Sequence, residues 1–516
     1  MSVAEGMADV YSSERVRRSL LHFAFGKTFG VIAGLGLLLV IVRALDPADY
    51  GFYVAAQALL EVIAQFSSFG LLVAAQRYLP ELMAKREGRA LERLSYGLVA
   101  GRIATLALAL MLLYPVTHLV AHGLDLEGHE AAIRLYLVVI FFESLARFLE
   151  VIFDSLLLQG VSQIALLLRA GIRVAGISAL FVHAGGHIEL EHWILIDAFA
   201  AFAGALWGGL SLVRFLRRHA GSSPGDHAQL EPRRYARYSL PLFVAASMYT
   251  ASGPNTVKLV ASSVLSTVQF AAFGFAAAFS AMLQRYLPVF LLIGMIRPLF
   301  VAARQRDDYS QRLPAMAALV FRLNAFALVP VIAFLVVAGE VLASLLTGGR
   351  YPLAAGYLLA FAVVLLAQAF RAVASMTAQA MENARAPIVG TGLGLLGLGV
   401  GLALNAPWPG YGLCAGLVLS ELLFGGWVIR ALRGQGLEYR AGLRFYALVV
   451  AHGVVGALVA AGVLAASGAL GAIVALGLSA IAGLAAYLLS AFAWKPFSAA
   501  ERDTLNRILK RKVFVW

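Results

Sequence analysis

Between residues 314 and 338 the sequence reads PAMAALVFRLNAFALVPVIAFLVVA, and Arg322 is its single ionisable residue. The hydrocarbon core of a bilayer is about 30 Å thick and needs roughly 20 apolar residues in a helix, so this stretch is long enough to cross a membrane. The whole chain follows the same pattern, because 61% of its 516 residues are hydrophobic and 13% are charged. A soluble protein carries roughly 25% charged residues. The composition therefore excludes a soluble enzyme, a nucleic-acid-binding protein and a disordered scaffold.

Runs of this kind recur along the chain and predict an all-α polytopic membrane protein with 14 transmembrane helices. The runs are too long for β-strands, and they are rich in Leu and Ala without alternation. The predicted spans are residues 22–43, 51–74, 95–116, 131–152, 161–182, 193–213, 239–262, 269–293, 314–338, 353–377, 387–404, 411–429, 445–466 and 470–492.

The positions of Lys and Arg predict the orientation, since cytoplasmic loops are enriched in both residues. With the N-terminus inside, 29 of the 41 Lys and Arg residues fall in inner segments and one, Arg350, falls in an outer loop. We therefore expect both termini in the cytoplasm, and most of the +13 net charge reflects topology rather than a binding patch. The tail, residues 495–516, is predicted to form an amphipathic helix on the cytoplasmic leaflet.

A shift of 220 residues overlays one half of the chain on the other. Tyr50–Tyr53 then aligns with Phe270–Phe273, and the intramembrane Arg102 aligns with Arg322. Six spans separate the two starts, so the repeat is predicted to be parallel, with substrate at the interface of two bundles that alternate access. The expected organisation is a six-helix bundle in residues 1–220, a second in 221–430, and the last two helices with the cytoplasmic tail in 431–516.

Ionisable residues inside the spans are the candidate functional residues, since a charge at a helix centre costs at least about 2.5–3.5 kcal/mol. Arg43, Arg134 and Arg371 lie near span ends, where the side chain is expected to reach the interface. The central cations outnumber the central acids, which predicts a cationic cavity for an anionic cargo such as a phosphate. The predicted cavity residues are Arg102, Arg147, Arg169, Arg173, Arg285, Arg322, Lys27 and Lys258.

Two alternatives stand beside the cationic cavity. Arg169 and Arg173 share one helix face at i,i+4 and repel each other unless an anion or a carboxylate lies opposite. Glu143, Arg147, Glu150 and Asp154 also share a face, which is typical of a self-neutralised structural stripe as well as of a transport site. Each arginine could instead bind backbone carbonyls at a helix break. The candidates for proton or cation coupling are Glu61, Glu143 and Glu421.

Enzyme, cofactor and metal motifs are missing from the sequence. Gly26-Lys27-Thr28 resembles the end of a phosphate-binding loop, but Leu21 stands where that loop needs glycine. The histidines lack zinc-site spacing, and the single cysteine, Cys414, cannot form an intrachain disulfide. We expect a protein that is not an enzyme, needs no cofactor or metal, and takes its energy from a gradient or from disposal of its cargo.

The stretch Leu45–Tyr53, which reads LDPADYGFY, resembles the polysaccharide-transport branch of the multidrug/oligosaccharidyl-lipid/polysaccharide (MOP) exporter superfamily. These are the Wzx-type flippases of O-antigen and exopolysaccharide synthesis. Gly70–Arg77, Gly349–Tyr351 and Ala380–Arg385 fit the same pattern. The chain departs from it near the seventh span, where Asn255 and Lys258 replace an acidic residue that is common in the family.

The resemblance implies two six-helix bundles plus two further helices in the bacterial inner membrane. It also implies an activity, the outward flipping of undecaprenyl-diphosphate-linked oligosaccharide by alternating access, with membrane lipids, a polysaccharide polymerase and chain-length machinery as partners. Lipid II flippases of the same superfamily rank second. An integral-membrane polymerase or ligase is the competing class, although such enzymes usually need a sizeable outer loop bearing Arg or His.

Overall fold

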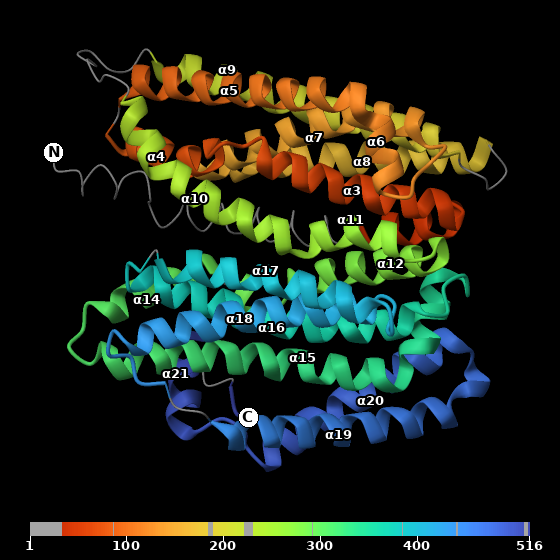
Figure 1. Cartoon of the computed structure of the whole chain (residues 1–516). Coiled ribbons are helices and arrows are strands. Elements are labelled where there is room, and N and C mark those ends of the chain that lie inside the picture. Colours follow the sequence, from red (N-terminus) through yellow and green to blue (C-terminus); the bar gives the residue numbers. More distant parts are fainter. Residues whose placement is uncertain are drawn as a thin grey trace. The chain divides into compact units, whose positions relative to one another are not determined.

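A computed structural model describes residues 34–85, 87–183, 189–220, 231–291, 293–383, 385–439, 442–509 and 514–516. Within these ranges the regular structure consists of helices and includes no strand, as the sequence predicted (Figure 1). The chain forms two compact units, of which unit 1 comprises Met1–Ala251 and Lys258–Ser263, and unit 2 comprises Ser252–Val257 and Val264–Trp516. The division into two repeated six-helix bundles, residues 1–220 and 221–430, remains a prediction from the sequence.

Unit 1 begins, in the described residues, with the short apolar helix Gly34–Ala44. It continues with α3 (Pro47–Phe66), α4 (Leu71–Ala84), α5 (Gly88–Leu113), η1 (Tyr114–Val116), α6 (Thr117–Gly123), α7 (Glu130–Ser155), α8 (Gln159–His183), α9 (Leu190–Ala220) and α10 (Pro232–Ser252). Helix α11 (Pro254–Val264) contributes residues to both units.

Unit 2 holds the remaining helices. They are α12 (Thr267–Gln284), α13 (Pro288–Leu291), α14 (Ile293–Arg304), α15 (Tyr309–Thr347), α16 (Ala354–Ala380), α17 (Arg385–Asn405), α18 (Tyr411–Arg433), α19 (Leu443–Ala466), η2 (Gly468–Leu470), α20 (Ala472–Ala493) and α21 (Ala499–Leu509).

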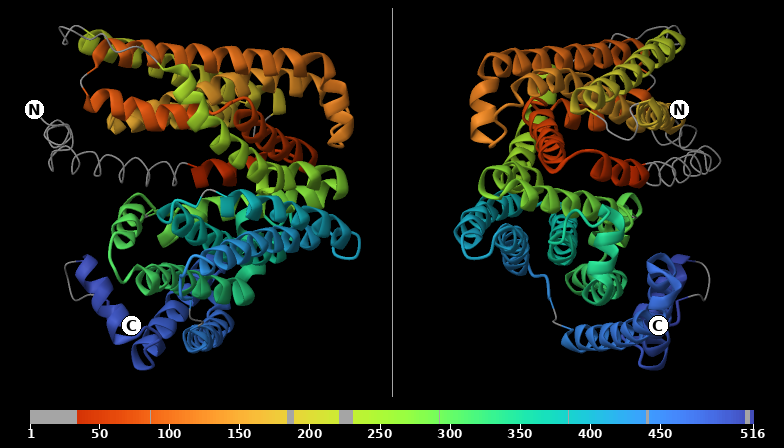
Figure 2. Two further views of the ribbon diagram at one scale, coloured as in Figure 1. Left: turned by 60° about the vertical axis from the view of Figure 1, so that its left-hand side comes forward. Right: turned by 90° about the vertical axis from the view of Figure 1, so that its right-hand side faces the viewer.

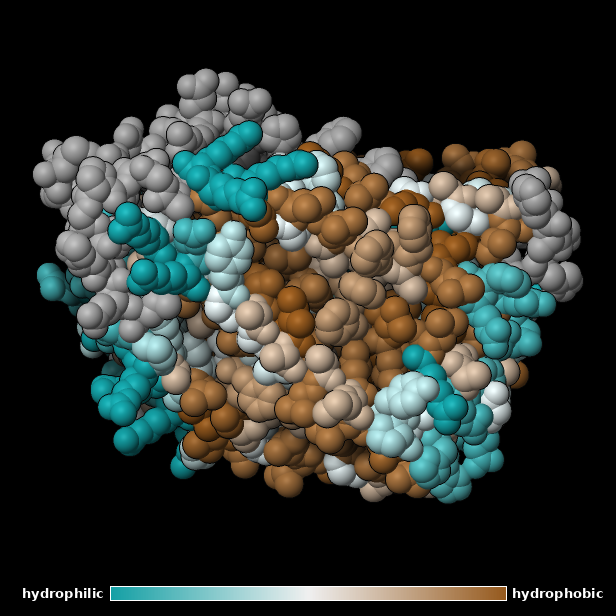
Figure 3. Space-filling model, turned by 90° about the horizontal axis from the view of Figure 1, so that it is seen from above, coloured by the Kyte–Doolittle hydropathy of each residue, from teal (hydrophilic) through white to brown (hydrophobic). Residues whose placement is uncertain are grey.

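Ten of the described helices are long and apolar enough to cross a membrane, and α3 with α4 forms one further span that bends by 58°. Helix α7 coincides with the predicted span 131–152 but carries too many charges to satisfy the same criterion. On the face shown in Figure 3, hydrophobic side chains gather across the middle and hydrophilic side chains lie at both ends. The chain is a multi-pass membrane protein.

Local sequence signals fix the start of the second helix in each half. Pro47 opens α3 behind Asp46, whose side chain accepts a hydrogen bond from the backbone N–H of Asp49 at 2.8 Å. Ser266 and Gln269 form a capping box at the start of α12. Caps of this kind satisfy backbone N–H groups that a helix start leaves unpaired.

Packing within each unit joins helices that are distant in sequence. In unit 1 a buried apolar cluster that includes Leu79, Leu94, Ile152 and Leu216 joins α4, α5, α7 and α9. In unit 2 the helices α17 and α18 lie side by side (Figure 1), while α19 and α20 pack on each other and on α15. Figure 2 shows α19, α20 and α21 (dark blue) as a group beside α15.

Candidate functional site

The main concentration of buried charge in unit 1 is an ionic cluster that four helices build. We define it by seven side chains: Glu61 from α3, Glu143, Arg147 and Glu150 from α7, Arg169 and Arg173 from α8, and Asp197 from α9. Each of these residues interrupts an apolar run, and lipid cannot solvate a charge. The fold therefore turns them toward one another, in the arrangement that intramembrane charges require.

Glu143 is the centre of the ionic cluster. Its Oε1 accepts from Arg147 Nε at 2.9 Å and also from Arg169, and its Oε2 accepts from Arg173 Nη2 at 3.1 Å. The Glu143 and Arg169 side chains are 5% and 4% exposed. A buried carboxylate that contacts three guanidinium groups stabilises the fold. Removal of the carboxylate, or of an arginine that it binds, would leave a charge without its partner in a medium of low dielectric constant.

The outer contacts of the ionic cluster complete the pairing of the arginines. Arg173 Nε donates to Asp197 Oδ1 at 2.8 Å. Arg169 also donates to Glu150, and Arg147 also donates to Glu61. Four carboxylates thus face three guanidinium groups, so the cluster has no excess of positive charge. Glu143, Arg147 and Glu150 therefore fit the self-neutralised structural stripe, which the sequence left open as an alternative, better than they fit a cationic cavity.

Exposure divides the ionic cluster into a deep part and a rim. The deep part consists of Glu143, Arg169 and Asp197, whose side chains are at most 5% exposed. The rim is the Arg147–Glu61 pair, whose side chains are 39% and 40% exposed. Lys258 on α11 is half-buried and interacts electrostatically with Glu61. The rim is therefore partly exposed, whereas the deep part is closed.

Two members of this site escaped the sequence analysis. Asp197 lies in the predicted span 193–213, and its single signal is an acid in an apolar run. Gly204 on α9 leaves room for the Arg169 stem, because a Cβ atom at Gly204 would lie 2.6 Å from Arg169 Cδ. No local pattern in the sequence marks that close approach.

Three more of the predicted cavity residues, Arg102, Arg285 and Arg322, have no place in the ionic cluster. Arg102 is 2% exposed and donates to Ser67 Oγ at 3.1 Å and to the Ala64 carbonyl oxygen at 3.0 Å. It therefore follows the alternative in which an arginine binds backbone at a helix break. Arg285 is exposed at the C-terminal end of α12. Lys27 lies outside the described residues.

Arg322 of unit 2 binds Glu501 of the C-terminal helix α21, and its guanidinium carbon lies 5.4 Å from the centroid of the Phe445 ring. The tail around α21 packs through Phe497 and Trp516 against a buried aromatic cluster. Arg102 and Arg322, which the 220-residue shift aligns, therefore have different partners. The tail is helical as predicted, and its basic residues Lys510, Arg511 and Lys512 lie outside the described residues.

Glu421 on α18 pairs with Arg371 on α16. Arg371 Nη1 lies 3.2 Å from Glu421 Oε2, its Nη2 donates to Thr391 Oγ1 at 3.0 Å, and its side chain is 14% exposed. The expectation that Arg371 reaches the interface is therefore wrong. Proximity to a span end does not decide a position when a buried acid lies on the neighbouring helix.

Replacement of Arg371 by methionine is expected to lower the stability of the protein by about 3 kcal/mol, because it strands the buried Glu421 carboxylate. The double variant R371M/E421Q should recover most of that loss, because it leaves no unpaired charge. Thermal unfolding in detergent measures both. A double variant as unstable as R371M would show that the arginine acts through packing rather than through the acid.

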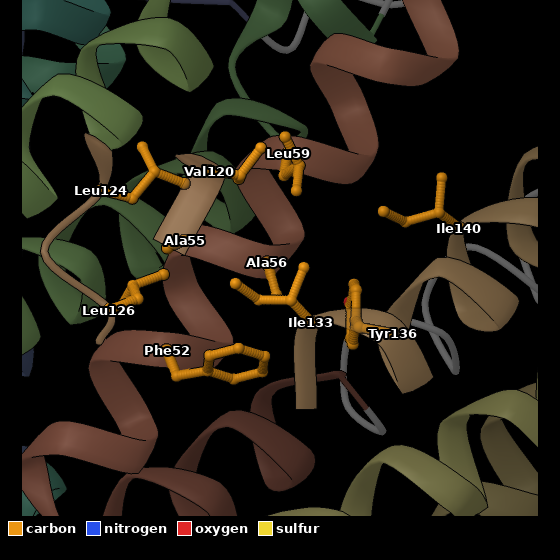
Figure 4. A pocket seen from close by; sticks show the side chains of 10 residues that line it. All are labelled: Phe52, Ala55, Ala56, Leu59, Val120, Leu124, Leu126, Ile133, Tyr136 and Ile140. Carbon is orange, nitrogen blue, oxygen red and sulfur yellow. The ribbon is translucent and has the colours of Figure 1, made fainter. Parts of the chain in front are cut away.

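A small apolar pocket lies between α3, α6 and α7 (Figure 4). Its walls include Phe52, Leu59, Ile133 and Tyr136. The space inside is about 10 Å³, which holds about one water molecule. This pocket is too small to hold a cargo molecule.

No family model matches the chain, and no curated protein sequence matches it. Solved structures do match. The lipid II flippase MurJ in an inward closed conformation gives a TM-score of 0.61 at 10% identity, over 95% of this chain and 99% of that chain. An inward-facing multidrug resistance MATE family transporter of the MOP superfamily gives 0.58 at 14% identity, over 81% of this chain and 98% of that chain.

A third match is the MATE transporter VcmN of Vibrio cholerae in its bent form, with a TM-score of 0.51 at 16% identity, over 82% of this chain and 98% of that chain. At these identities the likeness is one of fold. The chain has the fold that MurJ and the MATE transporters of the MOP superfamily share.

Proposed function

We propose that this protein is a flippase that moves an undecaprenyl-diphosphate-linked oligosaccharide from the cytoplasmic to the outer leaflet of the bacterial inner membrane by alternating access. The observation that carries the proposal is the share of this chain that each similar structure covers. The MurJ fold accounts for 95% of the chain, whereas the MATE folds leave about a fifth of it without a counterpart. A flippase of lipid-linked saccharides is thus a better template than a drug exporter.

Two cargoes share the diphosphate chemistry. The motif Leu45–Tyr53 favours the Wzx-type cargo, a repeat unit of a surface polysaccharide. The match to MurJ favours lipid II. Both cargoes present a diphosphate to the protein, so the same basic side chains would serve either one, and the saccharide distinguishes them.

The rim of the ionic cluster is our candidate for the diphosphate site. Arg147 keeps one hydrogen bond to the buried Glu143 and shares its outer Nη1 with the half-exposed Glu61. Phosphate oxygens fit a guanidinium group as a carboxylate does, so a phosphate can replace Glu61 on Arg147 without disturbing the deep part. Lys258 would supply a second cation, and the released Glu61 is the candidate for proton coupling. Arg169 and Arg173 would then hold the site in place.

The test is a bacterial strain that lacks this protein, complemented with variants at equal membrane abundance. The wild-type chain should restore surface polysaccharide, and R147A should lower its export at least tenfold, because the guanidinium group that receives the phosphate is gone. R147K should retain an intermediate level. The exposed Arg93 of α5 is the matched control, and R93A should export normally.

Three outcomes would decide against the proposal or redirect it. Unchanged export in both R147A and K258A would refute the rim as the diphosphate site. Rescue of a strain depleted of its lipid II flippase, without any effect on surface polysaccharide, would assign lipid II as the cargo. Export of shortened polymer, with full translocation of the repeat unit, would assign the protein to the polymerases instead.

A further inference from the structure

Each unit contains a transmembrane segment that is interrupted near the same place in the repeat. In unit 1, α3 begins at Pro47 and α4 ends at Ala84; in unit 2, α12 begins at Thr267 and α14 ends at Arg304. Both boundaries are related by the same shift of 220 residues that aligns the sequence halves. The interruptions fall at Ser67–Gly70 and Arg285–Leu287. In transporters, interrupted helices in corresponding positions of two repeats point to the moving and binding parts.

The break in unit 1 is built into the backbone. Phe69 and Gly70 have φ values of 42° and 82°, and the chain bends by 58° there. A Cβ atom on Gly70 would lie 3.0 Å from the Cβ and carbonyl oxygen of Ser239 on α10. Glycine thus allows both the left-handed backbone and the close approach of α10.

Arg102 on α5 holds the C-terminal end of α3 at this break. Its guanidinium group donates to the Ala64 carbonyl oxygen and to Ser67 Oγ, and among the described residues no carboxylate forms an ion pair with it. The last carbonyl groups of a helix lack intrahelical partners and carry partial negative charge. A buried cation costs several kcal/mol in a membrane, so its position at a helix end, without an acid, indicates a specific task.

Asn324 makes the comparable contact in unit 2. It lies on α15, the long helix that follows the interrupted segment, two residues beyond Arg322, which is the position aligned with Arg102. It is fully buried; its Oδ1 accepts from the backbone N–H of Val289 in α13 at 3.1 Å, and its Nδ2 donates to the Val320 carbonyl oxygen at 2.7 Å. The side chain therefore satisfies a backbone N–H just after the break. In both units, one buried polar side chain from the next long helix forms hydrogen bonds with the chain beside the interruption.

We propose that Arg102 and Asn324 are positioning residues for transport, which hold the two interrupted segments broken at Ser67–Gly70 and Arg285–Leu287. Each break then acts as a pivot about which α4 in unit 1, and α14 in unit 2, can swing on the predicted cytoplasmic side. Loss of the Arg102 contacts would let α3 and α4 relax toward one continuous helix. The link to transport rests on the proposed flippase function, whereas the pivot itself does not.

The experiment measures the bend of the α3–α4 segment directly in the full-length chain. In a C414S background, which removes the one native cysteine, spin labels are placed at the exposed positions Ala48 and Lys85. With a rise of 1.5 Å per residue, straightening of a 58° bend lengthens the distance between these labels by about 6 Å. We expect that shift in R102M, and little change in R102K, whose ammonium group can still donate to Ala64.

Two milder variants keep the test decisive if R102M does not fold. S67A removes one of the two acceptors of Arg102 and should broaden the distance distribution toward the longer value. G70A strains the left-handed position and should do the same without touching Arg102. An unchanged distance in S67A and G70A, or in folded R102M, would overturn the proposal. The corresponding variants in unit 2 are N324L and N324D. N324L removes the acceptor for the backbone N–H of Val289, and N324D keeps it.

Transport is the second readout, measured as the flipping of lipid-linked oligosaccharide in proteoliposomes. We expect R102M and N324L to lower the rate at least tenfold and R102K to regain at least half of it, at equal reconstituted protein. Changed distances without any flipping by the wild-type chain would refute the flippase function and leave the pivot intact. Normal flipping by R102M with a lengthened distance would refute the positioning role.

Discussion

Replacement of Glu143 by glutamine is expected to destabilise unit 1 by at least about 5 kcal/mol, enough to keep the protein from accumulating in the membrane. Among the described residues, Glu143 is the one carboxylate that contacts Arg147, Arg169 and Arg173 together. Glutamine preserves the shape of the side chain but removes the negative charge. The three guanidinium groups would then lose the carboxylate that lies between them, and their mutual repulsion in the buried centre would be offset only by the outer acids Glu61, Glu150 and Asp197.

The measurement is membrane abundance together with thermal unfolding of the detergent-purified protein. E143D, which keeps the charge, should retain more than half of the wild-type abundance. E61Q is the matched control at the exposed rim and should unfold near the wild-type temperature. The double variant E143Q/R169Q should lose less than the two single variants together, because the paired groups are removed together. A normal melting temperature for E143Q would show that the ionic cluster is not the anchor of unit 1.

The second large effect is expected at the contact of α17 with α18. A Cβ atom on Gly397 would lie 2.5 Å from the carbonyl oxygen of Gly416 and 2.7 Å from the backbone nitrogen of Ser420. These obstacles are backbone atoms, which cannot rotate away. G397L must therefore push the two helices apart along their length, and we expect a loss of at least about 4 kcal/mol.

Gly399 provides the control within the same helix. It lies two residues farther along α17 and is exposed, and a Cβ atom added to it would have no described atom within 4 Å beyond its own helix backbone. G399L should unfold at or above the wild-type temperature, because leucine favours a helix more than glycine does and the side chain would point to lipid. Equal unfolding temperatures for G397L and G399L would contradict the close helix contact.

The ionic cluster changes the picture of how this protein would handle an anion. A cavity lined by free arginines would attract any phosphate, whereas here the deep arginines already have carboxylate partners, and in our proposal only Arg147 at the rim exchanges its partner. This arrangement favours a site in which cargo and Glu61 compete for Arg147. Competition between a carboxylate and a cargo phosphate would provide a direct link between cargo binding and the protonation of Glu61.

The sequence determined the membrane class, the helix positions and the chemistry of the buried residues. Apolar runs predicted the long helices, because a bilayer accepts a backbone whose hydrogen bonds are satisfied within each segment. They did not predict α6, α14 or the interruptions after α3, α10 and α12. The i,i+4 spacing placed Arg169 and Arg173 on one face and required an anionic partner. That partner exists, as Glu143 and Asp197.

Only the tertiary structure decided which charge meets which. Arg102 and Arg322 occupy aligned positions in the sequence repeat, yet one binds the end of α3 and the other binds Glu501 of α21. Arg371 lies near a span end, yet a buried acid on α18 holds it. Helical periodicity fixes the face on which a side chain lies, and nothing local in the sequence specifies the helix across from it. Lipid cannot solvate a charge, so an arginine takes its partner from the neighbouring helix. That helix determines whether the arginine pairs with a buried acid, binds the end of an interrupted helix, or lies at the exposed edge of an ionic cluster.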